Sequence, residues 1–185
     1  MKLLDGVIVS SLMLLFVVTA DVAGQQHVRA ALQVVNERRA APPFRLANAS
    51  GRVVRLSDFR GKPVVLNLWA TECRGCRAEL PAFIELDRVY KDKGLVVIGV
   101  SMDVMYEDLK TAREGWARVK PFIKSRRMNY TILLDDGSVE KAFDVTALPA
   151  TYLIDRSGRT AATYIGVVEP ADLENNVKTL LTERR

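Results

Sequence analysis

The stretch "VVLNLWATECRGCRAELP", residues 64–81, joins an apolar run to the two cysteines of the chain, Cys73 and Cys76. The run extends from residue 63 to residue 70 and is typical of a strand that is buried on both faces. A helix is predicted over residues 75–93, where apolar residues recur at helical spacing before a glycine. The cysteines therefore lie between the end of a core strand and the first turn of a helix.

Other patterns extend this unit in both directions. Alternating residues around a Ser-Gly turn predict a hairpin over residues 44–56, and a second apolar run predicts a strand over 94–101. A crossover helix is expected over 106–127, then a strand, a short helix, a second hairpin turning at 155–158, and a final helix opened by a proline. This order predicts an α/β domain with a central mixed β-sheet flanked by helices.

The N-terminal part of the chain indicates export. Residues 6–20 carry no charge, and a run of that length suits the apolar region of a secretory signal better than a bilayer-spanning helix. We expect residues 1–23 to be a signal peptide or a membrane anchor. Residues 24–41 are expected to be a linker, either a spacer or a short amphipathic helix, and residues 42–185 the folded domain. The expected location is the periplasm or the extracytoplasmic face of a bacterial-type membrane.

The charge pattern argues against a nucleic-acid partner. The formal net charge is +5, but the basic residues are spread along the chain and interrupted by acids, which is typical of a solvated surface. The basic segment "REGWARVKPFIKSRR" within residues 102–129 has two interpretations. It is either the solvated face of the crossover helix, which we favour, or a docking surface.

Three chemical roles are open to a Cys-x-x-Cys pair. Structural zinc needs four ligands, whereas this chain has two cysteines and one histidine, His27, so no metal site is expected. A permanent disulfide across so short a loop would constrain the unfolded chain very little. A redox pair explains the position best, because a helix N-terminus favours the thiolate of Cys73, and Cys76 one turn later can resolve a mixed disulfide.

The flanking residues carry a family resemblance. Residues 64–81, together with "VTALPATYLIDRSGR" at 145–159, resemble the thioredoxin-like proteins of the TlpA/ResA group, which are extracytoplasmic thiol–disulfide oxidoreductases. The similarity runs from about Pro43 to the C-terminus. It implies a thioredoxin fold with an N-terminal β-hairpin extension. It also implies no cofactor beyond the redox-active disulfide between Cys73 and Cys76.

The resemblance assigns roles to individual residues. Cys73 matches the exposed nucleophile and Cys76 the resolving thiol. Pro149 matches the family's cis-proline beside the cysteines, and X-Pro bonds are where cis peptides occur. The backbone of Leu148 would then pair with an extended segment of the substrate.

Other residues around the cysteine pair also match positions of the family, but some of them have a second, purely structural interpretation. Glu79 matches an acidic residue that assists proton movement, a surface glutamate being the alternative. Asn67 stands where ordinary thioredoxins keep a buried aspartate. Trp69 is assigned with Glu72 to the substrate-binding surface, a plain core role for Trp69 being the alternative. Glu72 departs from the family, which usually has an aromatic residue there, and an acid is expected to raise the pKa of the Cys73 thiol and alter which partners approach.

The expected function is thiol–disulfide exchange with protein thiols and disulfides outside the cytoplasm. The resemblance implies that the protein works as a reductant, with cytochrome c maturation as a candidate setting and an upstream membrane protein as electron donor. One alternative is a peroxiredoxin-like peroxidase, although Ala70 replaces the threonine expected three positions before the reactive cysteine. Another is a non-enzymatic binding protein with an inert disulfide.

Overall fold

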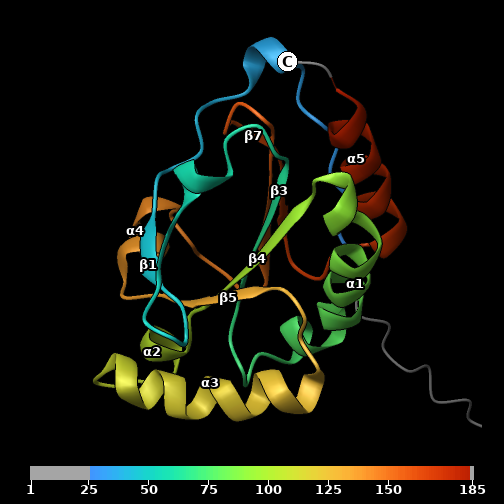
Figure 1. The fold of residues 1–185 in the computed structure, drawn as a ribbon. Coiled ribbons are helices and arrows are strands. Elements are labelled where there is room, and N and C mark those ends of the chain that lie inside the picture. The colour runs from blue at the N-terminus through green and yellow to red at the C-terminus, as the bar shows by residue number, and fades with distance from the viewer. Residues whose placement is uncertain (1–25, 184–185) are drawn as a thin grey trace, which may run out of the picture.

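A five-stranded sheet forms the centre of the molecule in a computed structural model that describes residues 26–183 (Figure 1). The strands β3 (Val64–Trp69), β4 (Val96–Ser101) and β5 (Thr131–Leu134) run parallel. β6 (Ala150–Ile154) pairs antiparallel with β3, and β7 (Thr160–Ile165) antiparallel with β6, giving the order β5-β4-β3-β6-β7. The mixed sheet predicted from the sequence is confirmed.

Helices and a hairpin cover the two faces of this sheet. Apolar side chains of α1 (Arg74–Tyr90), α3 (Ala112–Arg126) and α5 (Pro170–Thr182) share one core with β3. The opposite core is closed by α4 (Ser138–Ala142) and the N-terminal hairpin, which lie on the left of Figure 1, across the sheet from α1 and α5. Within residues 26–183, no helix has the length and apolar character that crossing a membrane requires.

The N-terminal hairpin extension is also confirmed. β1 (Arg45–Ala47) pairs antiparallel with β2 (Val53–Arg55), and Leu46 and Val54 face each other across the pair. Both side chains are buried, because the alternation of polar and apolar residues turns one face of the hairpin toward the core. The expected signal or anchor at residues 1–23 lies outside the described residues.

The crossover helix begins later than the sequence predicted. Instead of one helix over residues 106–127, there is a single turn, α2 (Asp103–Tyr106), followed by a break and then α3. Asp108 in the break has a positive φ of 48°, a left-handed conformation that ends a helix. α3 starts after Thr111 because Thr111 and Glu114 form a capping box there.

The segment expected as a spacer or amphipathic helix lies along the domain. Its described part, residues 26–41, has no regular structure apart from one 3-10 turn, η1 (Val35–Glu37), and two isolated bridges. Its backbone bonds to β7 and to the connection after it: Gln33 N donates to Ala161 O at 2.8 Å and Val28 N to Val167 O at 2.7 Å. β7 is the last strand of the sheet, so without this cover its edge would expose unpaired backbone groups. We call residues 26–41 the strap.

A buried arginine fastens the strap to the C-terminal helix. Arg38 donates to both carboxylate oxygens of Glu183, at 2.6 and 2.7 Å, and lies 3.4 Å from the Asp155 carboxylate. The side chain of Arg38 is only 2% exposed, whereas the neighbouring Arg39 is exposed. The strap is therefore part of the folded unit.

Replacing Arg38 tests this conclusion. Arg38→Ala removes the cation from the partly exposed Glu183 and leaves the buried Asp155 with Arg159 alone, so the free energy of unfolding should fall by about 2 kcal/mol. Urea denaturation measures the change. The exposed neighbour gives the matched control, Arg39→Ala, which should stay close to wild type. Equal, small effects of both substitutions would show that the strap is only loosely attached.

Candidate active site

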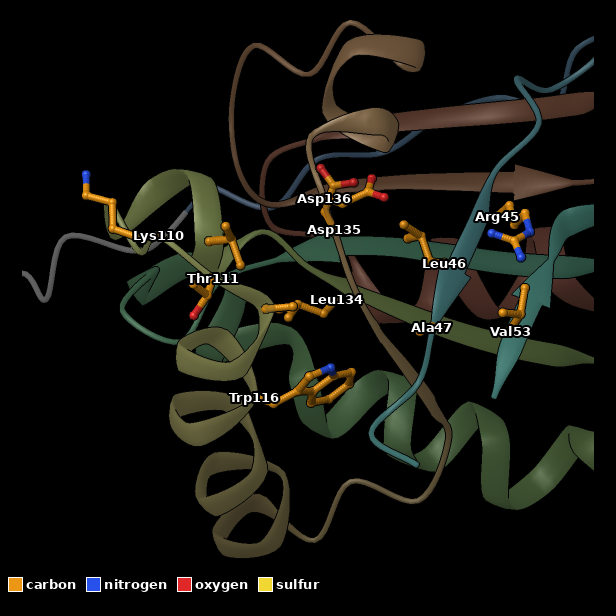
Figure 2. Close-up of a pocket in the computed structure, with 12 residues that line it drawn as sticks. Arg45, Leu46, Ala47, Val53, Lys110, Thr111, Trp116, Leu134, Asp135 and Asp136 are labelled. Carbon is orange, nitrogen blue, oxygen red and sulfur yellow. The ribbon is translucent and has the colours of Figure 1, made fainter. Parts of the chain in front are cut away.

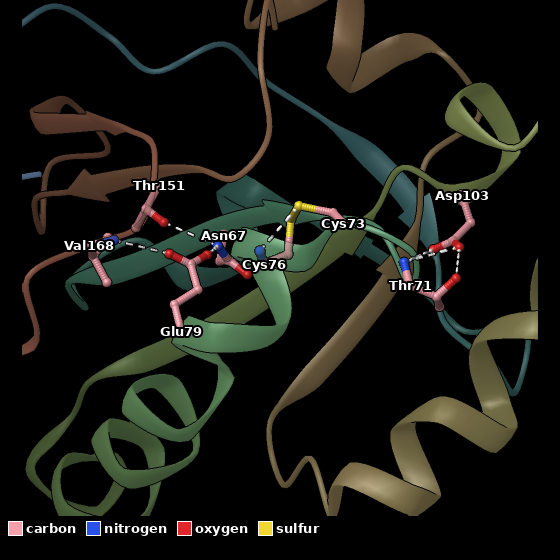
Figure 3. The surroundings of a disulfide bond; sticks show 8 residues. All are labelled: Asn67, Thr71, Cys73, Cys76, Glu79, Asp103, Thr151 and Val168. Atoms are coloured by element: carbon pink, nitrogen blue, oxygen red, sulfur yellow. Dashed lines mark hydrogen bonds between the residues drawn. A yellow bond between two sulfur atoms is a disulfide. The ribbon is translucent and has the colours of Figure 1, made fainter. Parts of the chain in front are cut away.

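The cysteine pair lies at the connection between β3 and α1 (Figure 3). Cys73 and Cys76 form a disulfide, and Cys73 is the N-cap of α1, its sulfur accepting a hydrogen bond from the backbone N–H of Cys76 at 3.1 Å. Cys73 is half-buried, whereas Cys76 has no exposed surface. A sulfur atom of a substrate can therefore reach Cys73, whereas Cys76 is buried below Cys73.

The peptide between Leu148 and Pro149 is cis, and this loop lies against the cysteine pair. A Cβ atom added to Gly75 would lie 3.2 Å from Pro149 Cδ and 3.1 Å from Val167 Cγ2. The residue between the cysteines therefore touches the proline loop, as the resemblance implied. Pro149 is buried and Leu148 is half-buried, which leaves part of Leu148 accessible beside the pair.

Glu79 lies below the disulfide, one helical turn after Cys76 (Figure 3). It is 3% exposed, which contradicts the alternative that it is a surface glutamate. Its carboxyl group accepts hydrogen bonds from Asn67 Nδ2 at 2.7 Å and from the Val168 N–H at 3.2 Å. Burial raises the pKa of Glu79 to about 8, although both hydrogen bonds act in the opposite direction.

Trp69 has a core role. Its side chain has no exposed surface and stacks on Phe122 of α3, with ring centroids 5.3 Å apart. The indole nitrogen lies 2.9 Å from where a Cβ on Gly99 would be, so the ring occupies the space that this glycine leaves free. A buried side chain of this kind cannot contact a substrate, and the assignment of Trp69 to the substrate-binding surface is corrected.

Glu72 is exposed and is paired with two arginines. Arg118 Nη2 lies 3.0 Å from one carboxylate oxygen and Arg77 Nη1 lies 3.8 Å from the other. Arg77 follows closely in the sequence, but Arg118 comes from the middle of α3. The sequence did not identify Arg118, because its partner Glu72 lies 46 residues earlier. The segment around Arg118 shows only that it is rich in basic residues.

A second buried acid holds the loop before Cys73 from the other side. Asp103, the first residue of α2, accepts hydrogen bonds from the N–H and hydroxyl groups of Thr71 and from the Ser101 hydroxyl at 2.7 Å. Asp103 has no exposed surface. Sequence reasoning missed this group, since the aspartate lies in a different strand–helix connection from the cysteines.

The rest of the described chain contains clefts but no cluster of metal ligands. Across residues 26–183, no group of three or more His, Cys, Asp or Glu side chains is placed to hold a metal ion, and His27 is exposed on the strap. A cleft of about 390 Å³ lies between the hairpin and α3, lined among others by Arg45, Trp116 and Asp135 (Figure 2). Its lining includes none of the residues around the disulfide.

Comparison with known proteins places this site in a family. The model of the AhpC/TSA family matches residues 38–162. The thioredoxin-like protein YneN of Bacillus subtilis is 31% identical over 143 residues, which cover 77% of this chain and 79% of YneN. The thiol-disulfide oxidoreductase ResA of Geobacillus kaustophilus is 32% identical over 141 residues, covering 76% and 75%.

A solved structure agrees with these relatives. The exposed pneumococcal lipoprotein thioredoxin Etrx1 from Streptococcus pneumoniae superposes with a TM-score of 0.63 at 28% identity, covering 75% of this chain and 99% of Etrx1. The fold is therefore the thioredoxin fold, with the cysteine pair at its usual helix N-terminus. The chain belongs to the AhpC/TSA family and is a thioredoxin-like thiol–disulfide oxidoreductase.

Proposed function

We propose that the protein reduces disulfides in extracytoplasmic proteins, with Cys73 as nucleophile and Cys76 as resolving thiol. The observation that carries this proposal is the unequal exposure of the two sulfurs at one helix N-terminus. Thiol–disulfide exchange needs one sulfur that a partner can reach and a second that attacks only from within. The N–H groups at the start of α1 favour the thiolate of the first.

The reaction balances in two steps. The Cys73 thiolate attacks one sulfur of the substrate disulfide, the substrate S–S bond breaks, and the departing substrate sulfur takes up a proton. Cys76 then loses its proton and attacks the Cys73 sulfur, which releases the second substrate thiol and forms the Cys73–Cys76 disulfide. Two electrons and two protons pass to the substrate, and a dithiol donor must supply two of each to restore the reduced pair.

The remaining assignments are proposals of the same kind. Leu148 and Pro149 border the place where a substrate segment would lie, because their loop touches Gly75 between the cysteines. The relative Etrx1 is described as an exposed lipoprotein, which supports export of this chain, with residues 1–23 as signal or anchor. A membrane protein as electron donor and cytochrome c maturation as the setting rest on the resemblance to the TlpA/ResA group.

Peroxide reduction has weaker support. The position three residues before Cys73 is Ala70, a buried residue whose methyl group offers no hydroxyl to a bound peroxide. Exchange with protein disulfides is the function that the site supports best.

Substituting the resolving cysteine tests the proposed roles. In a Cys76→Ser variant, the mixed disulfide on Cys73 cannot be resolved, so substrate proteins should remain attached. Non-reducing electrophoresis and mass spectrometry of the captured species would identify them. The matched control, Cys73→Ser, also lacks the disulfide and should capture nothing, because Cys76 is buried. Capture by Cys73→Ser and not by Cys76→Ser would reverse the assignment.

Glu79 should control the second step through its proton. Its carboxyl group lies one turn below Cys76 and becomes ionised as the pH passes about 8, when it can accept the Cys76 proton. The rate of mixed-disulfide resolution should therefore rise through about pH 8 in the wild type. Glu79→Gln should remove that inflection and slow resolution by about 10²-fold.

Single-turnover kinetics between pH 6 and 9.5 measure both effects. Glu85→Gln is the control, since it removes an exposed acid from the same helix. Stability offers an independent check: the folded state holds the Glu79 proton between the ordinary pKa of 4.5 and about 8, so stability should fall as the pH rises through that window. An unchanged pH profile in Glu79→Gln would exclude Glu79 from the proton transfer.

A further inference from the structure

Arg118 connects α3 to the two residues that precede the nucleophile. Its Nε donates to Thr71 Oγ1 at 2.9 Å, and its Nη2 donates to Glu72 Oε1 at 3.0 Å. A guanidinium group that binds neighbouring residues through different nitrogens fixes their orientation as well as their charge. The loop before Cys73 is thus held from a helix that lies more than 40 residues later in the chain.

The same guanidinium is the shared cation of three acids. Its Nη2 also lies 3.0 Å from Glu107 Oε2, and its Nε lies 3.5 Å from the buried Asp103 carboxylate. The Arg118 side chain is 35% exposed and that of Glu72 is 57% exposed, so salt partly screens the pair. Removing Arg118 would leave Glu72 with Arg77 alone, at the longer distance of 3.8 Å.

The position of Arg118 is fixed by the packing of its helix. Val119, the next residue, has no exposed surface, and Phe122 stacks on Trp69 at the end of β3. The Thr111 capping box fixes where the helix starts. Arg118 therefore points at the loop because α3 is anchored on both sides of it.

Glu72 needs such a partner because of where it stands. It directly precedes Cys73, the N-cap of α1, and the free N–H groups of a helix N-terminus attract any nearby anion. An unrestrained Glu72 carboxylate would compete with the Cys73 thiolate for those N–H groups and would also repel it. The hydrogen bond to Arg118 holds the carboxylate toward α3 and offsets its charge.

We propose that Arg118 is a positioning residue for thiol–disulfide exchange, which acts by holding Glu72 so that the Cys73 thiolate stays favoured. The inference rests on the proposed role of Cys73 as nucleophile. It also explains how an acid can stand where the resemblance to the TlpA/ResA group implies an aromatic residue. The other charged groups paired with this loop or with Arg118 are Arg77, Asp103 and Glu107. Arg74 follows Cys73 as the first residue of α1, and Glu79 lies one helical turn after Cys76, below the disulfide.

The test is a double-substitution cycle on Arg118 and Glu72. Each variant is made in the full chain with Cys76→Ser, so that a single thiol titrates. Iodoacetamide alkylation between pH 4 and 10 then gives the pKa and the reactivity of Cys73. Arg118→Gln should raise the pKa of Cys73 by about one unit and lower its alkylation rate at pH 7 by about threefold to tenfold.

Rescue separates positioning through Glu72 from a merely structural role. In Arg118→Gln/Glu72→Gln, the rate should return to within about twofold of Glu72→Gln alone, since the unrestrained acid is gone. The defect of Arg118→Gln should also shrink in 1 M salt. Lys120→Gln is the matched control, because it removes an exposed positive charge from the same helix. It should leave the pKa and the alkylation rate of Cys73 unchanged.

Two results would overturn the proposal. One is an unchanged pKa and alkylation rate of Cys73 in Arg118→Gln. The other is an equal loss of alkylation rate in Arg118→Gln whether or not Glu72 is present. Thermal unfolding of each variant shows whether a defect comes from lost folding, in which case Glu72→Gln would not rescue it. Alkylation reports the thiolate whether or not a partner protein is captured, so failure of the proposed function and failure of this inference are distinguishable.

Discussion

The hydrogen bond between Glu79 and Asn67 is the contact on which the geometry of the site depends. It ties the first turns of α1 to the middle of β3, and the other oxygen of Glu79 binds the Val168 N–H. That second bond fixes the connection after β7, whose Val167 touches the position between the cysteines. The carboxyl group therefore joins the helix, the core strand and the connection after β7 beneath the disulfide.

The strap extends this arrangement to the N-terminal part of the chain. Val28 donates to Val167 O, and its own carbonyl accepts from the Glu169 N–H at 2.9 Å. The same four-residue connection is thus held by Glu79 from inside and by the strap from outside. The strap therefore begins beside the connection that borders the active site.

Two acids on opposite sides of the nucleophile show how environment decides the role of a carboxyl group. Glu79 is buried, and desolvation raises its pKa to about 8, so it holds its proton at neutral pH. In the proposed mechanism it exchanges that proton with Cys76. Glu72 is exposed and bonded to Arg118, so its charge is compensated by a neighbour. The environment of Glu79 suits the proposed proton transfer. The negative charge of Glu72 opposes the Cys73 thiolate, and Arg118 offsets that charge.

The sequence predicted those features that local patterns determine. The buried strands, the second hairpin and the place of Cys73 at a helix N-terminus follow from runs of apolar residues and turn signals. The late start of α3 was missed because Leu109 stands at helical spacing from Ala112 and Trp116, so the apolar pattern crosses the capping box at Thr111. The strap and Arg118 could not be predicted, since both depend on partners brought together only by the fold: a free sheet edge in one case and Glu72 in the other.

A redox titration of the wild-type protein tests the central claim most directly. The protein is equilibrated in dithiothreitol or glutathione buffers of defined potential, and alkylation then counts free thiols. The account predicts a reversible two-electron transition with a midpoint nearer the thioredoxin value of about −270 mV than the value of about −120 mV for a strong oxidant. A midpoint near about −120 mV would contradict a reducing role, and a disulfide that no buffer reduces in the folded protein would contradict catalysis altogether.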